Sequence, residues 1–426
     1  MAKQTLTGTL RLRVLSTLLL ICSFPIYAQQ LNQVSRTEIL EEMMRLIEEN
    51  YVDKEVGSML IDSLQSRQYD DDTFDGFRKK LNTDVRKFSN DKHFRIIYNE
   101  TKDFSSAIVN SNRKINYGFE KVEILKGNIG YLRISYFENV ALAGNTARSA
   151  LNFLSNTDGI IIDLRDNNGG RKSMVQLILS YFFKENSKHL YDIIGRKEVF
   201  HGYTEAHLQG KKLDGIPLYV LINQMSFSAA EMLAFILQKQ KKATLIGVPT
   251  AGGGHTIGNY PISNGFSVNL PVGKVIDPIS KDGWEKVGVQ PDVEILNEDE
   301  YVNRAHLIAL KNRITQNLEM ADLFELNWRI DILTSTLEPV KLDNKVLKAY
   351  AGTYGRRIVS FSNGNLYYQG REGIEKALLI PVDNTIFRFD EVDYFRVQFV
   401  LDENGMPVAL KGLYDDQFED ITSRTR

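Results

Sequence analysis

The sequence has little cysteine and proline for its length. It contains one cysteine and 10 prolines in 426 residues. The cysteine, Cys22, lies in an N-terminal segment that we expect to be removed, so the mature chain is predicted to have no disulfide, cysteine-ligated zinc or cysteine nucleophile. A formal net charge of −2 gives no basic excess, and nucleic-acid partners are therefore not expected. With 43% hydrophobic and 25% charged residues, the composition is that of a globular protein with room for two or three domains.

The N-terminal segment has the pattern of a cleaved secretory signal. The basic residues that precede its apolar run are Lys3, Arg11 and Arg13. The run covers residues 14–21, and the segment ends on the small residue Ala28. The run is shorter than the ~20 apolar residues that span a bilayer, and no comparable run follows. We therefore expect a signal peptide at residues 1–28 and an exported protein, periplasmic or extracellular, without an integral membrane segment. In the alternative, a lipoprotein acylated at Cys22, bulky Ile21 would occupy a position where a small residue is preferred.

Residues 29–110 are predicted to form a helical module. Ser35 and Glu38 fit a capping box, and apolar residues follow at helical spacing over 39–47. A second amphipathic pattern covers 74–88.

Residues 111–336 are predicted to form an α/β core. Apolar runs typical of strands lie at 122–125, 129–137, 159–164, 217–222, 243–248 and 266–270. Helical patterns lie at 141–154, 174–183, 229–240 and about 300–333. Short strands that are apolar throughout and separated by helices indicate a largely parallel sheet.

Residues 337–426 are predicted to form a small antiparallel β domain, similar to a barrel. The pattern changes to strands alone after Glu338-Pro339. Asn363-Gly364 and Asn404-Gly405 each separate two strand-like runs, and Asn-Gly is a strong signal for a hairpin turn.

Ser228 is the candidate nucleophile. A predicted buried strand ends near residue 222, and Ser228 lies at the start of the next predicted helix. Free backbone N–H groups and the positive end of the helix dipole favour developing negative charge there. In the alternative interpretation, Ser226 or Ser228 only caps the helix, which is the more common use of serine at that position.

The loop after the strand at 159–164 is a second candidate. Gly169-Gly170 would let a backbone N–H approach a ligand without obstruction by a Cβ atom, and could supply an oxyanion donor. The alternative is a tight turn shaped by an ion pair between Asp163 and Arg165.

The sequence predicts no metal site and no cofactor. The histidines are His93, His189, His201, His207, His255 and His306. None forms a close pair of the His-Glu-x-x-His type, and no phosphate-binding loop motif is present. We assign no role to His189, His201 and His207.

Four ordered motifs are similar to the S41 family of serine peptidases. They lie at 160–170, 226–231, 247–254 and 283–292. The similarity covers about residues 31–335 and implies a ClpP/crotonase-like catalytic core that hydrolyses a peptide or protein substrate. Processing proteases of that family use a Ser–Lys dyad and a PDZ domain. This chain reads Thr-Ala-Gly-Gly-Gly where the lysine would lie, and too few residues precede the core for a PDZ domain.

The sequence therefore resembles the tricorn-like branch, which takes its base from a histidine. The resemblance implies Ser228 as nucleophile, His93 as general base and Glu285 as the orienting carboxylate. A serine hydroxyl needs such a base, and the imidazole needs an acceptor that fixes its tautomer. Asp91 is an alternative carboxylate for His93, and His255 is a second candidate base.

The resemblance also implies an oxyanion hole made by the N–H of Ala229 and one N–H from Gly169 or Gly170. Residues after 340 resemble lipocalin-like modules. The expected function is an exported serine peptidase. The alternative is a lipid- or peptide-binding protein of the same fold without catalysis.

Overall fold

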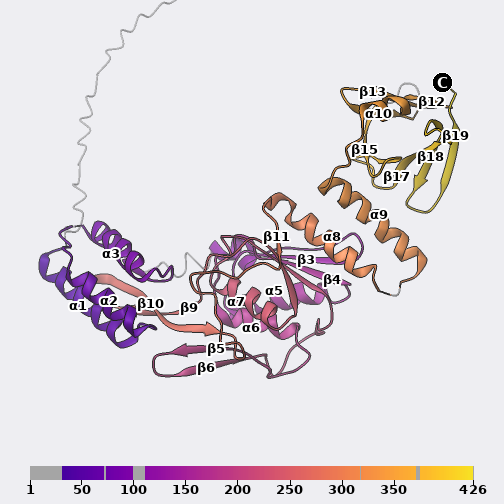
Figure 1. Cartoon of the computed structure of the whole chain (residues 1–426). Coiled ribbons are helices and arrows are strands. Elements are labelled where there is room, and N and C mark those ends of the chain that lie inside the picture. Colours follow the sequence, from indigo (N-terminus) through magenta and orange to yellow (C-terminus); the bar gives the residue numbers. More distant parts are fainter. Residues whose placement is uncertain (1–30, 72, 99–110, 317, 371–374, 426) are drawn as a thin grey trace, which may run out of the picture.

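The computed structural model describes residues 31–71, 73–98, 111–316, 318–370 and 375–425. The predicted signal peptide at 1–28 lies outside the described residues. Figure 1 shows the N-terminal helices on one side of a central α/β core and the C-terminal β domain on the other. No helix within the described ranges is long and apolar enough to span a membrane.

Three helices form the N-terminal part of the described chain: α1 (Gln33–Asn50), α2 (Lys54–Gln65) and α3 (Phe74–Ser89). Each begins at a polar N-cap, and the Asn32 side chain accepts a hydrogen bond from Ser35 N at the start of α1. α2 was not predicted, although its apolar residues Val56, Leu60 and Leu64 have helical spacing. Asn90 ends α3 in the left-handed conformation, with φ 51°, and turns the chain toward the core.

The core sheet has six strands in the order β11-β8-β7-β4-β3-β2. Their bounds are β2 (Phe119–Leu125), β3 (Ile129–Ile134), β4 (Gly159–Asp163), β7 (Leu218–Ile222), β8 (Ala243–Gly247) and β11 (Val293–Glu294). All neighbouring pairs are parallel except β2 with β3. The predicted parallel sheet and its order of strands and helices are therefore confirmed.

Helices cover both faces of this sheet. Ile160 and Ile162 of β4 pack in one apolar cluster with α5 (Val140–Phe153), α6 (Lys172–Tyr181) and α7 (Ala229–Lys239). Ile161 packs on the opposite face with α8 (Tyr301–Arg313) and α9 (Met320–Leu337). The single helix predicted at about 300–333 is therefore two helices. Burial on both faces explains why β4 is apolar throughout.

A second, antiparallel sheet connects the helices to the core. Its strands are β1 (Arg95–Tyr98), β5 (His189–Gly195), β6 (Val199–Tyr203), β9 (His255–Pro261) and β10 (Phe266–Ile276). The first half of β10 buries Phe266, Val268 and Leu270 against α1 to α3. Its last residues pair with β5. Strand β10 is therefore longer than the run predicted at 266–270, and it belongs to both parts.

The C-terminal domain is an eight-stranded antiparallel sheet that follows α10 (Asn344–Tyr350). Its strands are β12 (Gly352–Tyr354), β13 (Arg357–Ser362), β14 (Asn365–Gln369), β15 (Ala377–Pro381), β16 (Ile386–Arg388), β17 (Phe395–Leu401), β18 (Pro407–Tyr414) and β19 (Glu419–Ser423). A bridge from Tyr354 to Arg424 brings its two edges together. Both predicted Asn-Gly turns connect paired strands, so the predicted antiparallel domain is confirmed.

Candidate active site

Ser228 lies at a strained turn between β7 and α7. Its φ of 56° and ψ of −110° are sparsely populated for a residue with a side chain. The turn places Ser228 before the first residue of α7, where N–H groups of the helix have no partner inside the helix. Ser226, the other serine of the motif, is buried and donates to Leu164 O at 2.8 Å, so its hydroxyl is used in holding the loop.

Glu231 fixes this turn from inside the protein. Its fully buried carboxylate accepts hydrogen bonds from Ser228 N at 2.7 Å and from Thr250 Oγ1 at 2.6 Å. It also accepts from the N–H groups of Gly252 at 2.6 Å and Gly253 at 2.8 Å. Burial raises the pKa of Glu231, although these hydrogen bonds favour the charged form. One side chain therefore holds both the serine turn and the glycine loop opposite it.

His93 reaches Ser228 from the chain that follows α3. Its Nε2 lies 2.9 Å from Ser228 Oγ, across 135 residues of sequence. Its backbone N–H donates to Asp91 Oδ1 at 2.8 Å, and its ring stacks on Phe227 with centroids 4.5 Å apart. Burial lowers the pKa of His93 to about 4. The imidazole is therefore neutral at neutral pH and can accept a proton from the serine.

A buried chain of ionisable groups continues behind His93. Asp91 Oδ1 lies 4.0 Å from His93 Nδ1, and Asp91 Oδ2 accepts from His255 Nδ1 at 2.7 Å. Burial opposes ionisation of Asp91, but the hydrogen bond and charge of His255 lower its pKa overall. Glu285 Oε2 lies 3.7 Å from the same His255 Nδ1 and accepts from Gly254 N at 2.6 Å. Burial raises the pKa of Glu285.

The structure brings together Ser228 and His93 and places Glu285 further away. Among the described residues Glu285 makes no hydrogen bond or ion pair with His93; its carboxylate lies instead against Gly254 and His255. Asp91, considered only as an alternative, is the carboxylate beside His93. His255 binds Asp91 and, in the described part of the chain, makes no hydrogen bond to Ser228.

Two of the three candidate oxyanion donors have a free backbone N–H among the described residues. Gly169 N donates to Asn167 Oδ1 at 2.8 Å, so it is already used. The N–H groups of Ala229 and Gly170 have no acceptor among the described residues. Gly169 is needed for another reason: its φ is +92°, and a Cβ there would lie 2.8 Å from Phe227 O.

The loop before these glycines also contains the expected ion pair. Arg165 Nη2 lies 2.6 Å from Asp163 Oδ2, and the Asp163 side chain is fully buried. Both interpretations of this loop, a shaped turn and a source of N–H donors, are compatible with the geometry.

Ser228 and His93 open into a cavity of about 790 Å³. The cationic residues that line it are Lys92, Arg95, Arg171 and Lys172. Among the described residues no Asp or Glu lines the cavity. Arg95, Arg171 and Lys172 have no ion-pair partner in the described ranges, whereas Lys92 donates to Ala251 O. The cavity therefore has a positive potential and attracts anionic groups.

The fold and this site define an α/β protein with a serine and a neutral histidine at the mouth of a cationic cavity. Residues 128–295 match peptidase family S41, so the resemblance seen in the four motifs is confirmed. The chain is 29% identical over 188 residues to a carboxyl-terminal-processing protease of Picosynechococcus sp., covering 43% of each chain. It is 32% identical over 167 residues to a protein of the same name from Synechocystis sp., covering 39% of this chain and 37% of that one.

The match to these curated relatives spans less than half of their length. A solved structure of a protein from Parabacteroides merdae has the same fold, with a TM-score of 0.50 and 19% sequence identity. The fold match covers 66% of this chain and 99% of that one.

Proposed function

We propose that this protein is a serine-type peptidase with Ser228 as nucleophile and His93 as general base. The observation that carries the proposal is the 2.9 Å distance between Ser228 Oγ and an imidazole kept neutral by burial. The curated relatives named as carboxyl-terminal-processing proteases support a peptide or protein substrate.

In the proposed reaction, His93 Nε2 removes the Ser228 hydroxyl proton while Oγ attacks the peptide carbonyl carbon. The N–H groups of Ala229 and Gly170 stabilise the oxyanion. His93 then gives its proton to the leaving amine, which leaves an acyl-enzyme on Ser228. Water, deprotonated by His93, attacks the acyl carbon; the bond to Ser228 Oγ breaks, and His93 returns the proton to Oγ as the carboxylic acid product leaves. Asp91 stabilises the imidazolium, since it is the carboxylate closest to His93 Nδ1.

Glu285 is proposed to act on His93 indirectly, through His255 and Asp91. It holds Gly254 and lies beside His255, which in turn binds Asp91. The implied role of an orienting carboxylate is therefore shared along this chain of contacts, and Asp91 has the most direct part.

The glycine loop supports a histidine base in place of a lysine. A Cβ at Gly253 would lie 2.7 Å from His93 Cε1 and 2.2 Å from the Phe227 ring. Gly253 thus leaves the space that His93 occupies. The same loop contains no lysine that could act on Ser228.

The cationic cavity suggests the class of substrate. We propose peptides with acidic side chains, or a terminal carboxylate, near the bond that is cleaved. Arg95, Arg171 and Lys172 would pair with these groups. We also propose that the protein acts after export, on the basis of the N-terminal pattern.

A serine-directed fluorophosphonate probe tests the proposal. We expect covalent labelling of the protein, its loss in Ser228→Ala and a strong decrease in His93→Ala. Ser173→Ala is the matched control, because Ser173 lines the same cavity, whereas His93 has its hydrogen bond to Ser228. Absence of labelling, together with tight binding of a fatty acid or a peptide, would support the non-catalytic alternative.

A further inference from the structure

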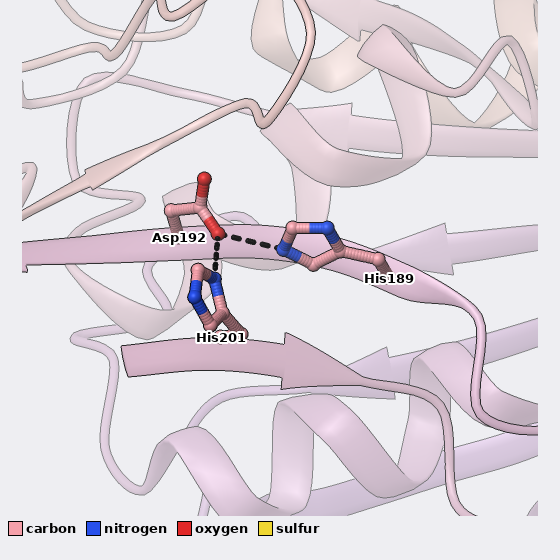
Figure 2. Close-up of side chains that lie close together, drawn as sticks. All are labelled: His189, Asp192 and His201. Atoms are coloured by element: carbon pink, nitrogen blue, oxygen red, sulfur yellow. Dashed lines mark hydrogen bonds and ion pairs between the residues drawn. The ribbon is translucent and has the colours of Figure 1, made fainter. Parts of the chain in front are cut away.

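Three side chains on the hairpin of β5 and β6 converge on one point outside the candidate active site. Figure 2 shows His189 and His201 both directed at the carboxylate of Asp192. His189 Nε2 lies 2.6 Å from Asp192 Oδ1, and His201 Nδ1 lies 2.7 Å from the same oxygen. From this geometry we propose that His189, Asp192 and His201 bind a divalent transition-metal ion, with Zn²⁺ as the best-suited ion.

Strand pairing and a register shift in the β5–β6 ladder place the three ligands on one face. Asp192 and His201 are direct partners in the β5–β6 ladder, so their side chains lie on the same face. In a regular strand His189 and Asp192, three residues apart, would point to opposite faces. The register shifts between His189 and Tyr191, and this irregularity turns His189 to the face of Asp192.

The ligand set suits zinc. Two imidazole nitrogens and one carboxylate oxygen are a common set of three protein ligands, with the fourth tetrahedral position open to water. The potential ligand atoms all lie within 4.8 Å of one another. Ligands bound to Zn²⁺ are about 2.0–2.2 Å from the ion. Ligands at that distance in a tetrahedral site are about 3.3 Å apart. The imidazole nitrogens, now 2.6 and 2.7 Å from Asp192 Oδ1, would therefore move outward by about 0.6–0.7 Å. Both histidines are exposed enough to do so.

The surroundings hold the ligands in place and leave a route for the ion. The Asp192 side chain is 5% exposed, and its other oxygen, Oδ2, lies 3.4 Å from Lys281 Nζ. Lys281 thus orients the carboxylate with Oδ1 toward the imidazoles. The His189 ring packs against Tyr203, with centroids 5.0 Å apart. The His189 and His201 side chains are 34% and 50% exposed, so the ion reaches them from solvent.

The role that we assign to the ion is support of the hairpin. An ion bound there joins β5 to β6 across the ladder. Phe200, adjacent to His201, packs under Lys172 with the ammonium 4.7 Å from the ring centroid, and Lys172 lines the cavity at Ser228. The ion would therefore stiffen one wall of the cavity without taking part in the reaction.

Titration of the chelator-treated protein with Zn²⁺ in a calorimeter tests this site. We expect one ion per chain and a rise in Tm with added Zn²⁺, since binding to the folded state alone stabilises it. His201→Ala should weaken the affinity by at least about 10-fold, because even loss of a group that only supports a metal ligand costs about 10- to 100-fold. His207 is an exposed histidine that follows the hairpin. His207→Ala is the matched control and should bind Zn²⁺ with the affinity of the unmodified protein.

Two results would overturn the proposal. One is an affinity for Zn²⁺ unchanged in both His201→Ala and His189→Ala. The other is binding lost in His255→Ala but kept in His201→Ala, which would assign the ion to the group of Asp91, His255 and Glu285. Fluorophosphonate labelling of His201→Ala, expected to be retained, separates this test from that of the proposed peptidase activity.

Discussion

The buried His93 makes a quantitative prediction for the pH dependence of activity. The free imidazole must be neutral to act as a base, and burial lowers the pKa of His93 from 6.5 to about 4. At about pH 5.5 a group with that pKa is about 97% neutral, whereas one with the ordinary value is about 9% neutral. Hydrolysis should therefore continue well into the acid range and be lost as the pH falls through about 4.

The assay is the pH profile of kcat/KM for a fluorogenic peptide, which reports the pKa of the free enzyme. Circular dichroism at each pH confirms that the protein is folded. Arg95→Gln is an informative variant, because the charge of Arg95 also lowers the pKa of His93, so its removal should shift the acid limb slightly upward. An acid limb with its midpoint near pH 6.5 would refute the assignment of a buried, neutral His93 as base.

The lowered pKa of His93 also predicts how the free energy of unfolding depends on pH. The folded state resists protonation of His93 between about pH 6.5 and 4, while the unfolded chain accepts the proton. The contribution of His93 to the free energy of unfolding is fully present above pH 6.5 and is lost as the pH falls toward 4. The loss amounts to about 3 kcal/mol, at 1.36 kcal/mol per pKa unit. His93→Gln should remove this part of the acid dependence in urea unfolding. An unchanged dependence would contradict the prediction.

Three further predictions concern the surroundings of Ser228. Gly169→Ala should lower kcat/KM by about 100-fold or more, since its Cβ would meet Phe227 O at a φ of +92° and displace the serine turn. Glu231→Gln should reduce the free energy of unfolding by about 1–3 kcal/mol in urea, because an amide has one acceptor oxygen for four donors; an unchanged value would contradict the role of Glu231. Arg171→Gln should reduce the preference for an acidic over a neutral peptide by about two- to fivefold in kcat/KM, and equal preference before and after would refute the cationic cavity as a determinant.

Local patterns predicted the parallel sheet and the C-terminal domain because their signals are short-range. The apolar runs of β4 and β7 and the turn at Asn363-Gly364 each lie within a few residues of sequence. The antiparallel sheet of β5, β6 and β9 was not predicted. The residues of β5 and β6 alternate between buried and exposed only in part. Strand β10 joins β1 and β5 across long stretches of chain, which no local pattern indicates.

The candidate site, like the fold, was predictable only where the signal is local in the sequence. Ser228 has a local signal, a strand followed by a turn and a helix. His93 has none, since 135 residues separate it from Ser228, and only the family resemblance pointed to it. The place of Glu231 in holding the turn was missed, although the acidic residue at the third position of the helix was a usable signal. No spacing in the sequence indicates that Asp91 contacts His255.

Strand β10 makes the geometry of the proposed catalytic pair depend on the packing between two parts of the molecule. The proposed base is attached to the helices and the proposed nucleophile to the core, and this strand packs against both. Its pairing with β9 is irregular between Pro271 and Gly273, midway between the two attachments. A change of twist there would move the imidazole of His93 relative to the hydroxyl of Ser228, and the proposed reaction requires their 2.9 Å separation.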